Sequence, residues 1–183
     1  MQRLVIGSLA AAVVMFVLGF VFYGLLFDYG LTPASPTAAM AVKDAMAVNL
    51  PGTGTYMIPA DEAAWQAGPG ALVKYVAAGG APDMATAMIG GFVQMFVSAL
   101  LIGFALTGVG GDFERQSRVV FWFSLAAAVF ICLGDPIWYG SDWKNSIFMF
   151  VTDSLLLLVG GLVLARWFTS AAVAATPAAA PAE

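Results

Sequence analysis

The chain has 183 residues, of which 61% are hydrophobic and 10% are charged. A soluble domain is typically about 45–50% apolar and about 25% charged, so this composition excludes an ordinary water-soluble protein and requires a bilayer as solvent. The formal net charge of −4 argues against nucleic-acid binding, because phosphate contacts need clustered lysine and arginine.

Four apolar stretches are each long enough to cross a hydrocarbon core of about 30 Å, which needs about 20 helical residues. They cover residues 4–27, 84–109, 118–139 and 143–168. The first is longer than the roughly 7–15-residue apolar region of a signal peptide, so we expect an uncleaved anchor. The sequence therefore predicts an all-α membrane protein, a four-transmembrane-helix bundle forming a single membrane domain over residues 1–168.

The loop between the first two spans, residues 28–83, is expected to be partly folded. Ser35-Pro36 is a typical helix start and predicts a short helix over 37–49. Residues 53–58 and 72–76 are β-prone and lie on either side of Gly and Pro turn signals, which predicts a small β-hairpin. Since a lone hairpin is marginal in water, it should pack on the helix ends or on a partner.

Arginine and lysine predict the orientation. The arginines flank one side of the bundle, where the loop 110–117 is short, and the lysines fall on the other side. The arginines are Arg3, Arg115, Arg118 and Arg166, and the lysines are Lys43, Lys74 and Lys144. The positive-inside rule then places both termini in the cytoplasm and the loop 28–83 in the periplasm of a bacterial inner membrane.

The C-terminal tail, residues 169–183, is rich in alanine and proline and lacks apolar periodicity. We expect it to be disordered, because it has little surface to bury.

Polar residues within the spans are candidates for a functional site, because burying them in lipid is costly. Gln94 and Asp153 each lie about ten residues into a span, at about 15 Å depth, so a direct hydrogen bond between them is feasible. One interpretation is structural, with Gln94, Ser98, Ser154 or Thr152 as hydrogen-bond partners of Asp153. The other is a proton or cation site at Asp153.

A second candidate lies at the outer end of the third span. Pro136 should break the helix there, and Trp138 and Tyr139 fit the aromatic belt of a membrane interface. One interpretation of this segment is a re-entering hairpin turn that is anchored at the membrane interface. Alternatively, Asp135 binds a cationic group near aromatic faces.

Small residues recur at helix-packing spacing in two spans. Ala87 and Gly91 form one small-xxx-small pair, and Gly161 and Ala165 form another. Such pairs let helix backbones approach closely, within the chain or between chains.

The sequence lacks the residue types and motifs that usually catalyse covalent reactions. There is no histidine, the usual general base and haem or zinc ligand, and the single cysteine, Cys132, is expected to be a buried thiol. No phosphate loop, nucleophile elbow or metal motif is present. The sequence predicts no catalytic residue, no cofactor and no metal.

Several short motifs together resemble a family of small bacterial inner-membrane proteins with four spans. They are VFYG at the end of the first span, TGTYMIP and GPGALVKYVAAGG in the loop, PIWYG after the third span, and GGLVLA after Asp153. The first span departs from the family pattern, because Leu26-Phe27-Asp28-Tyr29 stands where a Leu-Pro-Trp-type segment is common. The resemblance covers most of residues 3–167, supports the topology and implies no activity.

The sequence leaves three alternative functions to be tested. The first is a non-enzymatic accessory or assembly subunit that contacts lipid and other membrane-protein subunits, or a second copy of itself. The second is a small proton- or ion-coupled transporter using Asp153 and Gln94, with Asp135 at its outer mouth. The third, an enzyme acting on lipid through Asp135 and Tyr139, is disfavoured because such enzymes usually carry a metal with acidic residues, or histidine.

Overall fold

The computed structural model describes residues 2–77 and 83–169, which form two compact units. The first contains the described residues up to Thr32 and from Met88 onward, and the second is Pro33–Ala87. The single membrane domain over residues 1–168, in which the sequence places the loop 28–83, stays a prediction. The predicted disordered tail lies outside the described residues, apart from Thr169.

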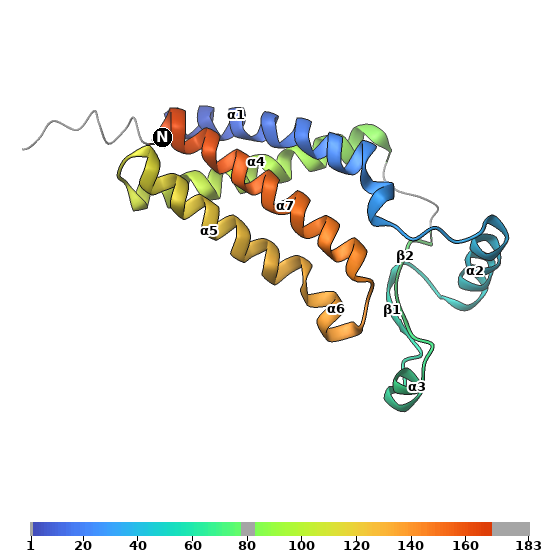
Figure 1. Ribbon diagram of the computed structural model, residues 1–183. Coiled ribbons are helices and arrows are strands. Elements are labelled where there is room, and N and C mark those ends of the chain that lie inside the picture. Colours follow the sequence, from blue (N-terminus) through green and yellow to red (C-terminus); the bar gives the residue numbers. More distant parts are fainter. Residues whose placement is uncertain (1, 78–82, 170–183) are drawn as a thin grey trace, which may run out of the picture. The chain divides into compact units, whose positions relative to one another are not determined.

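The first unit is a bundle of long helices (Figure 1). In order they are α1 (Gln2–Gly19), α4 (Met84–Val109), α5 (Phe113–Cys132) and α7 (Trp143–Leu164). Two π-helical segments extend the bundle: η1 (Phe20–Leu25) follows α1, and η3 (Ala165–Thr169) follows α7. Within the described ranges, four helical segments, each 24–27 residues long, are long and apolar enough to cross a membrane. This confirms the predicted mostly helical class with four candidate spans.

α7 packs between α1 and α5 in this bundle (Figure 1), and two adjacent glycines make the close approach feasible. A Cβ atom on Gly160 would collide with Met15 of α1. A Cβ atom on Gly161 would lie 2.5 Å from Cγ1 of Val120 on α5. The buried apolar core takes residues from α1, α4, α5, α7 and η3, and consists of Ala11, Met15, Ala99, Leu106, Val120, Leu156, Val163, Leu164 and Ala165.

The third long helix begins at Phe113, earlier than the predicted Arg118. Asp112 is its N-cap, with its Oδ1 atom accepting a hydrogen bond of 2.9 Å from the backbone N–H of Arg115. The hydropathy pattern misses this first turn because Phe113 is followed by four polar residues, Glu114 to Ser117. The connection from α4 is therefore a tight turn, in which Gly110 and Gly111 adopt φ angles of 61° and 85° that favour glycine.

The same helix is interrupted near its other end. α5 ends at Cys132, and a short helix, α6 (Gly134–Tyr139), follows Leu133. Pro136 lies in the first turn of α6, where its missing N–H leaves no bond unmade. Gly140, with φ of 65°, ends α6, and Asp142 caps α7 through the backbone N–H of Lys144.

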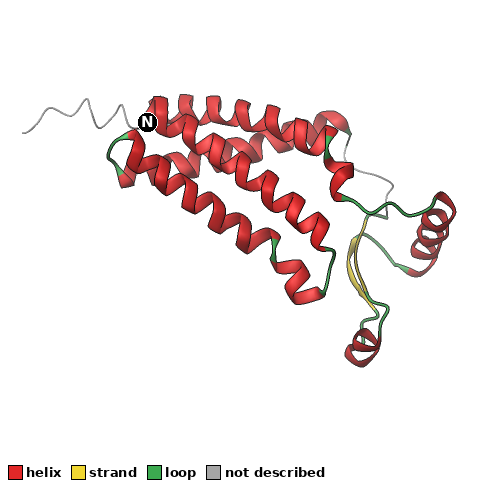
Figure 2. Cartoon of the chain, viewed as in Figure 1, coloured by secondary structure: helices red, strands yellow, loops and turns green. Residues whose placement is uncertain are grey.

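The second unit combines short helices and a hairpin (Figure 2). Its helices are α2 (Pro36–Asn49) and α3 (Glu62–Ala67), and its strands are β1 (Gly54–Ile58) and β2 (Ala71–Tyr75). The strands pair antiparallel, from Gly54 opposite Tyr75 to Ile58 opposite Ala71. The predicted short helix and small hairpin are confirmed. Ser35 caps α2 as expected, accepting a 3.2 Å hydrogen bond from the N–H of Ala38.

Candidate functional site

A polar cluster around Asp153 joins three elements of the bundle. Tyr23 of η1 donates its hydroxyl proton to Oδ1 of Asp153, and the Cys132 thiol at the end of α5 lies 3.4 Å from Oδ2 as a donor. The Tyr23 hydroxyl is also 3.0 Å from Oγ1 of Thr152. Asp153 is half-buried, whereas Thr152 is buried. We call these four residues the Asp153 cluster.

The π-helical segment η1 is the local feature that carries Tyr23. Its wider turn is closed by a 3.2 Å hydrogen bond from the N–H of Leu26 to the carbonyl of Val21. One extra residue per turn shifts the direction of the following side chains by about 100° around the helix axis. Short π segments are rare in helices and frequently occur at functional sites.

Three aromatic rings pack beside the cluster. Tyr23, Phe27 and Phe148 have ring centroids 6.2–6.5 Å apart, within the range of favourable aromatic pairs. Gly30 lies against Phe148, so close that a Cβ atom there would be 3.0 Å from the ring. The rings give the Tyr23 hydroxyl a firm position, because the side chain that carries it is packed on both neighbours.

The residues of the Asp153 cluster can perform few kinds of chemistry. Asp153 has two donors, a phenol and a thiol, and neither an ion-pair partner nor a third ligand for a metal lies with it among the described residues. A lone carboxyl group held by uncharged donors can link helices or take up and release one proton. These are the two interpretations that the sequence left open for Asp153.

The predicted partner Gln94 is not part of this cluster. Gln94 is exposed on α4, and its side chain makes no hydrogen bond in the described part of the chain. Ser98 donates to the backbone carbonyl of Gln94 at 2.9 Å, within the same helix. The Gln94–Asp153 hydrogen bond that equal depth would allow is therefore not formed, and Tyr23 donates to Asp153 instead. Equal depth in two helices does not make their side chains face each other.

The outer candidates remain separate from the cluster. Asp135, Trp138 and Tyr139 lie exposed on α6, with Trp138 80% exposed. Within the described ranges, no hydrogen bond, ion pair or ring contact joins these three side chains. The structure therefore does not assemble a cation pocket from them.

The two small-residue pairs differ in their surroundings. Gly161 and Ala165 are buried in the bundle, and Gly161 contacts α5. Ala87 is exposed, and a Cβ atom on Gly91 would meet only Phe16, at 3.9 Å. The pair on α7 thus lies at a helix interface, and Ala87 does not.

Sequence reasoning missed a second buried polar group, Gln116. Its side-chain amide donates to the carbonyls of Leu106 (3.3 Å) and Gly110 (3.5 Å), and its carbonyl accepts from the hydroxyl of Thr169. Gln116 is fully buried, and its hydrogen bonds connect the start of α5 with the end of α4 and with η3. Recognising Asp112 as an N-cap would have placed Gln116 in the helix and not in a loop.

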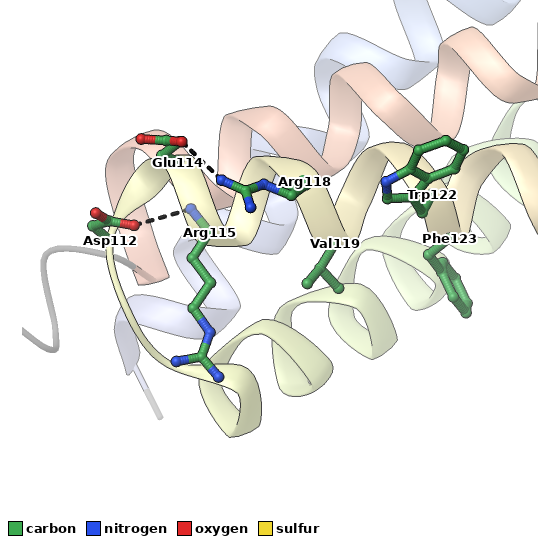
Figure 3. Close-up of a pocket in the computed structure, with 7 residues that line it drawn as sticks. All are labelled: Asp112, Glu114, Arg115, Arg118, Val119, Trp122 and Phe123. Carbon is green, nitrogen blue, oxygen red and sulfur yellow. Dashed lines mark hydrogen bonds and ion pairs between the residues drawn. The ribbon is translucent and has the colours of Figure 1, made fainter.

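Two hollows occupy the surface near that end of the bundle. The first, which we call the α5 hollow, has a volume of about 740 Å³. It is lined by Asp112, Glu114, Arg115, Arg118, Val119, Trp122 and Phe123 (Figure 3). The second, the α4–α5 groove, has a volume of about 310 Å³ and an almost entirely apolar lining from α4, α5 and Leu157.

Comparisons of this chain with protein-family models, with curated proteins and with solved structures found no match. The resemblance to small four-span bacterial proteins therefore stays an expectation from short motifs.

Proposed function

We propose that this chain is a non-enzymatic integral membrane protein that acts as an accessory or assembly subunit of a larger bacterial inner-membrane complex. Its four long helices cross the bilayer, with both termini cytoplasmic and the second unit periplasmic. The distribution of arginine and lysine supports this orientation.

The observation that carries the proposal is the apolar surface of the second unit. None of its described residues is buried. On α2, Met40, Val42 and Val48 are 52%, 57% and 84% exposed. On the hairpin, Met57 and Leu72 face each other across the strands, and each is more than 40% exposed.

A unit of this kind gains little from folding alone. A two-stranded hairpin is marginally stable by itself, and the described residues of this unit form no buried core, so its apolar side chains on α2 and the hairpin stay exposed. Covering them with another subunit would supply the burial that the unit lacks. The proposal therefore assigns the second unit to protein–protein contact.

A photo-crosslinking amino acid placed at Val48 tests this directly in the intact membrane. We expect one adduct of defined mass, containing another membrane subunit or a second copy of this chain. Lys43 is the matched control position, because it lies on the same helix about 140° away around the axis. A protein that gives no adduct at Val48 beyond the Lys43 control, and purifies as a monomer in mild detergent, would refute the proposal.

The Asp153 cluster supports a second candidate, a small proton- or ion-coupled transporter. Asp153 is an acidic residue in a candidate span, held by Tyr23 and Cys132. Transport predicts that Asp153→Asn abolishes a proton flux in proteoliposomes while expression is unchanged. Gln94→Ala serves as a control, because Gln94 is exposed and lies outside the cluster. Undiminished flux in Asp153→Asn would exclude this function.

A further inference from the structure

The α5 hollow carries charged side chains of both signs. Arg118 Nη2 and Glu114 Oε1 form an ion pair of 2.8 Å, in which the two side chains are 67% and 81% exposed (Figure 3). Such exposed pairs contribute little to stability, so both groups can bind a ligand at small cost. The Arg115 guanidinium has no ion-pair partner among the described residues. A guanidinium offers five donors, and its planar fork matches a phosphate.

The hollow changes from charged to apolar along α5. Beyond the charged residues its lining is Val119, Trp122 and Phe123, and the two aromatic side chains are 61% and 59% exposed. Val119 and Phe123 line both the α5 hollow and the α4–α5 groove, so the two adjoin each other along α5. A lipid molecule likewise has a charged headgroup next to apolar acyl chains. A charged hollow beside an apolar groove on a candidate membrane span therefore matches the two parts of a lipid.

The groove is also long enough for an acyl chain. From Val119 to Ile131 it follows α5 for roughly 18 Å, at about 1.5 Å per residue. One leaflet of a hydrocarbon core that is about 30 Å thick measures roughly 15 Å. The groove therefore matches the depth of a single leaflet.

We propose that the α5 hollow and the α4–α5 groove form one site for a phospholipid whose headgroup carries both a phosphate and a primary ammonium, as in phosphatidylethanolamine. The phosphate binds Arg118, and the Arg115 side chain, which points away from Arg118 in the unliganded hollow (Figure 3), turns toward it. The ammonium binds Glu114, and an acyl chain lies in the groove. Two arginines and two carboxylates line the hollow, and this balance fits a zwitterion better than an anionic headgroup.

The inference rests on bilayer insertion, which is part of the proposed function, but not on the assembly role. Flotation of alkali-washed proteoliposomes tests insertion separately. A failure of flotation would reject both proposals, whereas intact flotation without lipid selectivity would reject only the lipid site.

Native mass spectrometry of the delipidated full chain in mild detergent measures the selectivity. The probes are phosphatidylethanolamine, phosphatidylcholine and phosphatidylglycerol with identical acyl chains. We expect phosphatidylethanolamine to bind about tenfold more tightly than the other two, a difference equivalent to one charge-assisted hydrogen bond. Equal binding of the three lipids, or tighter binding of phosphatidylglycerol, would overturn the proposal.

Two variants of the protein test the ammonium and the phosphate of the headgroup separately. Glu114→Gln should reduce phosphatidylethanolamine binding to the level of phosphatidylcholine, because only the ammonium loses its partner. Arg118→Gln should weaken both lipids by about tenfold, because both carry the phosphate. Arg3→Gln is the control, since Arg3 is exposed and lies outside the hollow. A Glu114→Gln protein that keeps its preference would contradict the assignment.

The groove has its own matched pair of variants. Ala127 lines the groove, so Ala127→Phe should fill it and weaken all three lipids. Ala126 is exposed and lies outside the groove, so Ala126→Phe should bind lipid as the wild type does. Equal effects of the two substitutions would show that no acyl chain occupies the groove.

Discussion

The hydrogen bond from Tyr23 to Asp153 can be tested by removing a single oxygen atom. Tyr23→Phe keeps the ring and its contacts with Phe27 and Phe148. Only the donor to Asp153 and the contact with Thr152 are lost. The substitution therefore measures the polar interaction without creating a cavity.

The expected loss in the free energy of unfolding depends on which hydrogen bonds Thr152 and Asp153 keep in Tyr23→Phe. Thr152 still donates to the carbonyls of Phe148 and Met149, at 3.0 and 3.1 Å, so its hydroxyl is not orphaned. Asp153 keeps only the thiol of Cys132. Hydrogen bonds to charged groups are worth about 1.5–3 kcal/mol, but side-chain bonds between membrane helices average about 0.6 kcal/mol. Because Asp153 is half-buried, we expect a loss of about 1 kcal/mol in the free energy of unfolding.

The assay is a double-mutant cycle in mixed detergent, with unfolding by SDS followed by circular dichroism. Tyr23→Phe is combined with Asp153→Leu, which removes the acceptor. We expect a coupling free energy of about 1 kcal/mol for this pair. Tyr29→Phe is the control, because Tyr29 is 73% exposed and should couple with Asp153 by less than about 0.5 kcal/mol. If Tyr23 couples no more strongly than Tyr29, the cluster does not hold the helices together.

Three further predictions concern other parts of the bundle. Gln116→Leu should cost about 1 kcal/mol and Gln116→Ala about 2–4 kcal/mol in SDS unfolding, because only alanine adds a cavity to the lost hydrogen bonds. Gly161→Ala should destabilise the same transition by about 1–3 kcal/mol, since its new methyl group would collide with α5. Gly90→Ala, which meets no atom within 4 Å, should instead stabilise it by up to about 1 kcal/mol. Hydrogen bonds from Thr86 hold the pKa of Asp83 below its usual value, so the start of α4 is stabilised above about pH 4 and loses this support as the pH falls further. Amide exchange in the first turn of α4 should therefore quicken at acidic pH in the wild type, and show no such change in Asp83→Ala.

The helical class of the protein and most of its elements are predictable from the order of its residues. Length, composition and runs of apolar residues predicted four long helices, because the bilayer sets both the length and the polarity of a spanning helix. α4 begins and ends at the predicted residues 84 and 109. The cap at Ser35 and the hairpin strands were equally predictable, since capping and turn signals act within a few residues along the chain.

The hydrogen-bond partner of Asp153, in contrast, depends on how the helices pack and could not be predicted from the sequence. Counting residues placed Gln94 and Asp153 at one depth, but depth does not set the direction in which a side chain points around its helix. That direction depends on which helices pack together and on the π-helical turn that carries Tyr23. Gln116 was missed for a similar reason, because its burial depends on three helix ends that are far apart in sequence. Such contacts form only when the helices pack together. A small rotation of one helix about its axis would bring a different polar side chain next to its neighbour.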